Sequence, residues 1–218
     1  MSDIDDSTHS TTIDTIHQYS IDIDHREIYL YQEIDDSVAA AFIKNLNYLN
    51  HLNHDPITIY SLSIGGEMTY SLGIYDAIKL SVSPTIGISC GEVASMGTII
   101  AQAPNIRLLF PSTTFLIHEG SINLGDTEAK TAISTMNSFK EFIRRLYNIY
   151  YSSCKNGVFF HGKTESYIRK FFKQNLQRKS DWYLLAEEVV KYGLADGILG
   201  DGKYNNLSAI RNILSNTI

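Results

Sequence analysis

The stretch Thr85-Ile-Gly-Ile-Ser-Cys90-Gly91-Glu-Val-Ala-Ser-Met-Gly97 joins an apolar, β-branched segment to a run of small residues. Its first six residues are typical of a buried strand, and the run Met96–Ala103 is typical of a short buried helix. Ser95 therefore lies at a strand-to-helix junction, where backbone N–H groups and the positive end of the helix dipole can hold an oxyanion. Taken alone, a serine in such a place is more often a helix N-cap than a nucleophile.

In a second segment, Phe115-Leu-Ile-His-Glu-Gly120, three apolar residues are followed by His118, which lies 23 residues after Ser95. A histidine at the end of a strand can act as a general base, and its unperturbed pKa suits that role near neutral pH. A lone histidine in an apolar strand is more often a packed core residue. The pair of Ser95 and His118 nevertheless predicts a serine hydrolase.

A third segment, Ser61-Leu-Ser-Ile-Gly-Gly-Glu67, closes the predicted strand Ile57–Ser63 and precedes a predicted helix over residues 69–80. Two successive glycines allow positive φ angles and let a backbone N–H face a ligand without a Cβ in the way. Main-chain donors of this kind form oxyanion holes. By itself, the glycine pair is more often an ordinary tight turn.

Together these segments resemble the ClpP family, the proteolytic subunits of the caseinolytic (Clp) proteases. The resemblance extends from about residue 26 to residue 199. Five matching motifs carry it, in the family's order: Ser63-Ile-Gly-Gly66, Ile74-Tyr-Asp76, Ala94-Ser-Met-Gly97, Ile117-His118 and Ala186-Glu-Glu-Val-Val-Lys-Tyr-Gly-Leu-Ala-Asp196.

The resemblance implies a role for each matching residue. Ser95 is the expected nucleophile, His118 the base, and Asp181 the acid that orients His118. The backbone N–H groups of Gly66 and Met96 form the expected oxyanion hole. Asp181 follows His118 by 63 residues, which exceeds the family spacing, and the excess falls within residues 154–179.

The expected fold class is α/β. Strands alternate with helices, which by itself predicts a mainly parallel sheet with the active site at the carboxyl ends of its strands. The resemblance adds a ClpP/crotonase-like ββα superhelix and a long protruding handle helix at about residues 127–153. Predicted strands cover residues 26–31, 57–63, 85–90, 106–110 and 114–118. Asp36 is the predicted cap of one helix, and further helices begin at Thr69 and Met96.

The charge is concentrated at the N-terminus. Residues 1–25 contain six Asp and no Lys or Arg, which equals the net charge of −6 of the whole chain. This Ser- and Thr-rich segment is predicted to be flexible. The resemblance would place it at the axial pore of a ring, whereas the composition equally allows a tail without a role. Residues 26–200 are the predicted peptidase domain, and residues 201–218 a C-terminal extension.

Composition excludes several other classes. The 218 residues suffice for one domain with a proper core, and no apolar run is long enough to span a membrane. No signal peptide is recognised, and the two cysteines, Cys90 and Cys154, form no disulfide framework or zinc motif. The absence of a basic face with interleaved aromatics disfavours nucleic acid as a partner.

The expected function is that of an ATP-dependent, cytoplasmic serine endopeptidase that cleaves unfolded proteins and peptides. The resemblance implies stacked heptameric rings forming a tetradecamer, and an AAA+ unfoldase of the ClpX or ClpA type that uses the ATP. The subunit itself would need no metal or cofactor. Two alternatives stay open: a phage-type protease of the same fold that processes prohead or scaffold proteins, and a non-catalytic ring subunit.

Overall fold

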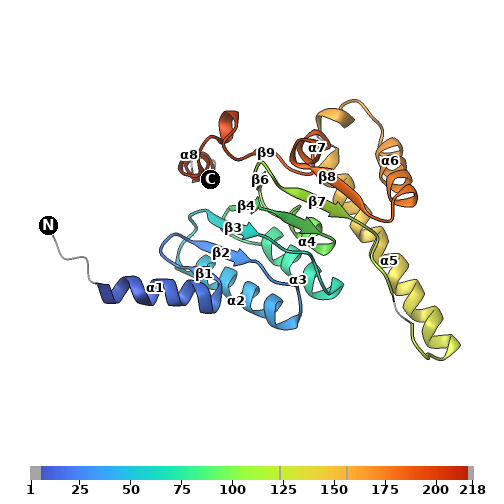
Figure 1. Cartoon of the computed structure of the whole chain (residues 1–218), viewed down its shortest axis with the longest axis horizontal. Coiled ribbons are helices and arrows are strands. Elements are labelled where there is room, and N and C mark those ends of the chain that lie inside the picture. Colours follow the sequence, from blue (N-terminus) through green and yellow to red (C-terminus); the bar gives the residue numbers. More distant parts are fainter. Residues whose placement is uncertain (1–5, 123, 156, 216–218) are drawn as a thin grey trace.

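A sheet of mostly parallel strands forms the centre of the molecule (Figure 1). The computed structural model describes residues 6–122, 124–155 and 157–215. The strand order in this sheet is β1-β2-β3-β4-β6-β9, and only β1 and β2 run antiparallel. The strands are β1 (Ile21–Asp22), β2 (Glu27–Leu30), β3 (Ile57–Ser61), β4 (Thr85–Ser89), β6 (Ile106–Leu109) and β9 (Gly197–Ile198). The predicted fold class is thereby confirmed.

A smaller sheet of three strands stands beside the first and carries the candidate site residues. It consists of β5 (Glu92–Ala94), β7 (Thr114–Ile117) and β8 (Trp182–Leu185), with β7 in the middle. β5 runs parallel to β7, whereas β8 runs antiparallel to it. The sequence did not predict β5, because three residues are too few to establish an alternating pattern.

Helices cover both faces of the central sheet. On one face, α2 (Asp36–Leu52) and α3 (Met68–Lys79) pack against Ile57 and Ile59 of β3. The N-cap of α2 is Asp35, whose carboxylate accepts a hydrogen bond from the Val38 amide, so the predicted cap at Asp36 was one residue late.

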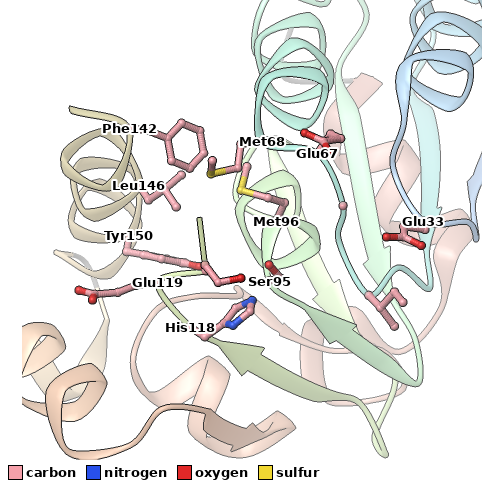
Figure 2. A pocket seen from close by; sticks show the side chains of 14 residues that line it. Glu33, Glu67, Met68, Ser95, Met96, His118, Glu119, Phe142, Leu146 and Tyr150 are labelled. Atoms are coloured by element: carbon pink, nitrogen blue, oxygen red, sulfur yellow. The ribbon is translucent and has the colours of Figure 1, made fainter. Parts of the chain in front are cut away.

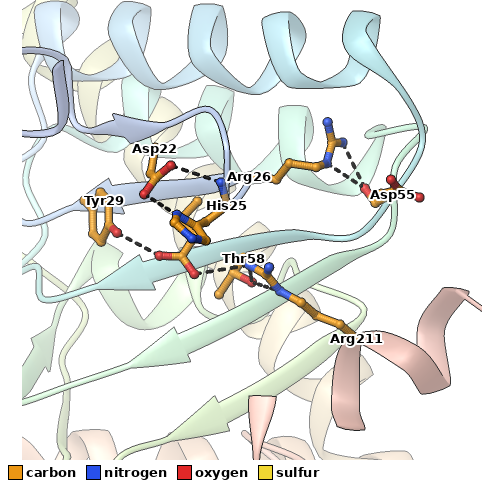
Figure 3. A network of polar contacts seen from close by, with 8 residues as sticks. Asp22, His25, Arg26, Tyr29, Asp55, Thr58 and Arg211 are labelled. Carbon is orange, nitrogen blue, oxygen red and sulfur yellow. Dashed lines mark hydrogen bonds and ion pairs between the residues drawn. The ribbon is translucent and has the colours of Figure 1, made fainter. Parts of the chain in front are cut away.

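The C-terminal extension packs on the opposite face of the central sheet. After a short 3₁₀ helix, η2 (Gly202–Tyr204), helix α8 (Leu207–Ser215) buries Ile210 completely against Ile86 and Ile88 of β4. Figure 3 shows Arg211 of α8 reaching Thr58, to whose hydroxyl it donates at 2.7 Å. Arg211 also pairs with the Glu27 carboxylate at 3.2 Å. Most of residues 201–215 is therefore part of the folded domain, and residues 216–218 lie outside the described part.

The N-terminal segment differs from its prediction. Residues Asp6–Tyr19 form helix α1, which projects from one end of the molecule in Figure 1. Ile21 follows in β1 and is only 4 % exposed, so the folded domain begins before the predicted boundary at residue 26. The prediction for residues 1–5 falls outside the described part of the chain. The sequence prediction gave the polar composition of the segment more weight than the apolar spacing of Ile13 and Ile16.

We expect deletion of residues 1–18 to lower the midpoint of thermal unfolding by less than about 3 °C. The described part of α1 contributes little buried surface, since Ile13 is 53 % exposed. The hydrogen bonds that Tyr19 and Ser20 accept from Asn45 and Tyr29 remain in the truncated chain. Scanning calorimetry of the truncated and full chains tests this, and a larger decrease would make α1 part of the stabilising core.

A matched control lies at the other end of the chain. The substitution Ile210→Ala removes a fully buried side chain and should cost about 2–4 kcal/mol of unfolding free energy. The truncation should leave the protein clearly more stable than this variant.

The other helices complete the fold. α5 (Ala129–Cys154) confirms the predicted long helix, and its N-terminal half extends beyond the body (Figure 1). α6 (Glu165–Arg178) and the 3₁₀ helix η1 (Val158–Phe160) occupy the segment without a counterpart in the family pattern. The remaining helices are α4 (Met96–Ile100) and α7 (Ala186–Lys191).

Candidate active site

Ser95 occupies a strained turn between β5 and α4. Its φ and ψ angles are 52° and −125°, an arrangement that non-glycine residues rarely adopt. The Ser95 N–H donates to the Leu116 carbonyl at 2.8 Å, and the preceding Ala94 N–H donates to the Ser63 carbonyl at 3.0 Å. The Ser95 side chain makes no capping hydrogen bond to α4, which removes the simple N-cap interpretation. The hydroxyl is presented to the cleft instead.

His118 follows the last residue of β7 and faces the same cleft. Figure 2 shows its imidazole directed toward the Ser95 side chain. The hydrogen bond between the Ser95 N–H and Leu116 fixes the separation of the two residues, because Leu116 lies only two residues before His118. The imidazole is about one-third exposed, so a substrate could reach it.

Asp181 reaches His118 through the pairing of two strands. β7 and β8 are antiparallel with Ile117 opposite Trp182, and continuing that register by one residue places His118 opposite Asp181. The His118 Nδ1 and the Asp181 Oδ1 are 3.9 Å apart, which is too long for a hydrogen bond. Asp196, the last residue of the fifth matching motif, pairs instead with Arg107 at 2.5 Å.

The inserted segment supports the strand that begins after Asp181. Phe171 and Phe172 of α6 pack edge-on against Trp182 of β8, with ring centroids 5.8 and 5.3 Å away. Further aromatic residues join this cluster, among them Phe160 and Tyr192. The insertion therefore builds an aromatic layer over β8 and does not displace Asp181.

The glycine turn after β3 lies directly against the Ser95 turn. A Cβ on Gly65 would come within 2.8 Å of the Met96 nitrogen, and one on Gly66 within 2.3 Å of the Ile34 carbonyl oxygen. Within the described residues, neither the Gly66 N–H nor the Met96 N–H donates a hydrogen bond. Both residues line the cleft, so the two amides are available to an oxyanion.

The cleft has a volume of about 400 Å³ and is lined by both apolar and acidic side chains. One side is apolar, and Figure 2 shows Met68, Met96, Phe142 and Leu146 gathered there. Acidic side chains stand elsewhere around it, namely Glu33, Glu67 and Glu119.

The resemblance predicted α5 as a protruding handle, and the contribution of α5 to the cleft was not predicted. Phe142, Leu146 and Tyr150 line the cleft, and they are spaced four residues apart on one helix face. That spacing could have indicated a buried face but not the cleft it adjoins.

The part of the chain that the structure describes contains neither a candidate membrane-spanning helix nor a candidate metal site. None of its helices is both long and apolar enough to cross a bilayer. None of its His, Cys, Asp and Glu side chains gather in the groups of three or more that a metal ion would need.

Comparison with known proteins places these features in a family context. The family model described as Clp protease matches residues 10–202. The chain is 29 % identical over 177 residues to "ATP-dependent Clp protease proteolytic subunit 2" of Prochlorococcus marinus subsp. pastoris, covering 80 % of this chain and 82 % of that protein. It is 28 % identical over 181 residues to "ATP-dependent Clp protease proteolytic subunit 1" of Chlamydia abortus, covering 81 % and 88 %.

Proposed function

The chain belongs to the Clp protease family, and on that basis we propose that it is a serine endopeptidase with Ser95, His118 and Asp181 as its catalytic residues. The observation that carries the proposal is the strained turn that presents Ser95 to His118 at a cleft with two free amides. Strain of this kind costs about 1–3 kcal/mol and persists where the surrounding contacts hold it. A serine with no catalytic role would have no need of it.

In the proposed mechanism, the Ser95 hydroxyl oxygen attacks the carbonyl carbon of the scissile peptide bond. His118 takes the hydroxyl proton on Nε2, while Asp181 stabilises the protonated imidazole from the Nδ1 side. The Gly66 and Met96 amides donate to the oxyanion of the tetrahedral intermediate. His118 then gives the proton to the departing amine, and water attacks the acyl-enzyme in a second cycle of the same transfers.

The apolar lining of the cleft supports a preference for substrates with an apolar side chain next to the scissile bond. Met68, Phe142 and Leu146 provide apolar surface next to Ser95 and Met96. An apolar substrate side chain beside the scissile bond would bury area there. We therefore propose peptides of unfolded proteins as the substrate class, since folded proteins rarely expose such side chains in extended segments.

The assembly is part of the proposal. The relatives are named as proteolytic subunits of ATP-dependent proteases, which supports assembly with other subunits and a use of ATP outside this chain. We propose that copies of this chain form a ring in the cytoplasm and receive substrates from a separate ATP-using unfoldase. Helix α5 also exposes apolar surface on its extended half, with Ile133 62 % exposed. Such surface is suited to contact between copies. The subunit itself is proposed to work without a metal or cofactor.

A fluorophosphonate probe, which reacts with activated serines, tests this proposal directly. The full-length chain is first separated by size, and each fraction is then labelled. We expect labelling in a high-mass fraction, and none in the variants Ser95→Ala and His118→Ala. The substitution Ser112→Ala, at an exposed turn serine, should leave the labelling unchanged. A correctly folded high-mass protein that does not label would favour a non-catalytic ring subunit.

A further inference from the structure

A buried chain of hydroxyl groups connects helix α5 to the Ser95 turn. The Thr98 hydroxyl donates to the Ser95 carbonyl oxygen at 2.7 Å, and the Tyr150 hydroxyl lies 2.7 Å from the same Thr98 oxygen. Thr98 is fully buried and Tyr150 is 3 % exposed. Because Thr98 has a single hydroxyl proton, and the Ser95 carbonyl accepts it, the Tyr150 hydroxyl must be the donor to Thr98.

The carbonyl held by Thr98 belongs to the peptide unit that contains the Met96 amide. A peptide unit is planar and trans, so its C=O and N–H point in opposite directions. Fixing the Ser95 carbonyl toward Thr98 therefore directs the Met96 N–H to the other side, where the cleft lies. The Thr98 backbone N–H also donates to this carbonyl, at 3.1 Å, and the hydroxyl adds the shorter contact of the two. The hydroxyl chain thus reinforces the direction of a proposed oxyanion donor.

Threonine hydroxyls in helices often bond to a carbonyl three or four residues back, and that contact alone would be ordinary. Two features make this case different. The accepting carbonyl belongs to the one strained residue of the cleft, and the hydroxyl receives a second bond from a residue 52 positions away. Hydrogen bonds in such a chain polarise one another, so the Tyr150 contact strengthens the hold of Thr98 on Ser95.

Packing holds the Tyr150 end of the hydroxyl chain in place. The Tyr150 ring stacks on Phe172 of α6, with centroids 5.6 Å apart and planes 14° from parallel. Burial raises the pKa of the Tyr150 phenol, which keeps the hydroxyl protonated as a donor.

From these contacts, and resting on the proposed function, we propose that Thr98 and Tyr150 are positioning residues for the oxyanion hole. Tyr150, acting through Thr98, holds the Met96 N–H in its donating direction. The position of α5 relative to α4 thereby influences the catalytic rate. A shift of α5 that breaks the Tyr150–Thr98 hydrogen bond would leave the Met96 N–H less well directed, while Ser95 and His118 stay in place.

The test compares variants of the full-length assembled protein on a fluorogenic peptide. Thr98→Val should lower kcat about 10- to 100-fold with KM within twofold, because a misplaced oxyanion donor weakens only the transition state. Tyr150→Phe should lower kcat about 3- to 10-fold, and Thr98→Ser, which keeps the hydroxyl, should stay within about threefold of the wild type. Tyr151→Phe, which removes a neighbouring hydroxyl on α5, is the matched control and should change nothing.

The affinity for an inhibitor that forms a tetrahedral adduct provides a second measurement of the same effect. A peptide boronate, which forms such an adduct with an active serine, should lose affinity in each variant by the same factor as kcat/KM. A purely structural role would lower thermal stability without this parallel loss.

The double variant Thr98→Val/Tyr150→Phe separates positioning from stability. Removing both hydroxyls leaves neither partner unpaired, so the thermal midpoint should recover relative to Thr98→Val alone. Under the proposal kcat stays low in the double variant, and recovery of kcat together with stability would overturn it. If Thr98→Val does not fold, Tyr150→Phe and the double variant carry the comparison. A wild type that neither labels with the serine probe nor cleaves peptide would instead refute the proposed function.

Discussion

Replacing Ser95 with alanine is expected to lower kcat/KM for peptide hydrolysis by about 10⁴-fold or more. The substitution removes the attacking oxygen and leaves only the oxyanion amides and substrate binding to assist water. The backbone of the turn should persist, because main-chain hydrogen bonds to Leu116 and Ser63 hold it rather than the Ser95 side chain. Thermal unfolding and the mass on gel filtration should therefore match the wild type.

The measurement is hydrolysis of a fluorogenic peptide, with the exposed Ser112→Ala variant as control. Residual activity near the wild-type level would show that another group is the nucleophile. Loss of activity together with loss of the folded state would leave the assignment to the labelling experiment, in which only a folded wild-type protein can react.

The sequence predicted β2, β3, β4 and β6 because isoleucine, leucine or tyrosine recurs through each of them, whereas β1 and β9 are two residues long and show no pattern. It also placed Ser95 and His118, since both lie within short motifs next to such strands. The boundary errors are local. The cap of α2 moved from Asp36 to Asp35, since two adjacent aspartates can each serve and only the backbone geometry decides between them.

What the sequence could not predict depends on contacts between distant segments. The position of Asp181 follows from the register of β8 against β7, and a long insertion separates the two strands. The Tyr150–Thr98 contact joins residues on different helices, and no local pattern signals it. The three-stranded sheet also depends on contacts between distant segments, because β5 is a strand through its pairing with β7 and not through a pattern in its own three residues.

The second large effect is expected for Asp181→Asn, which should lower kcat by about 100-fold or more while changing stability by less than about 1 kcal/mol. The carboxylate favours the tautomer of His118 that carries its proton on Nδ1 and leaves Nε2 free as the base. An asparagine amide can instead donate to Nδ1, which favours the wrong tautomer. Stability should change little, because the Asp181 side chain is 53 % exposed and makes no hydrogen bond within the described residues.

The separation of 3.9 Å between His118 and Asp181 is compatible with this role, because catalytic hydrogen bonds are often long before substrate binds. The matched control is Asp196→Asn, at the acid that pairs with Arg107. That pair is largely buried, so its loss should lower the thermal midpoint and spare kcat in the folded fraction. Steady-state kinetics and calorimetry of both variants distinguish the two acids: an unchanged kcat in Asp181→Asn would remove Asp181 from the triad, and the reverse pattern would transfer its role to Asp196.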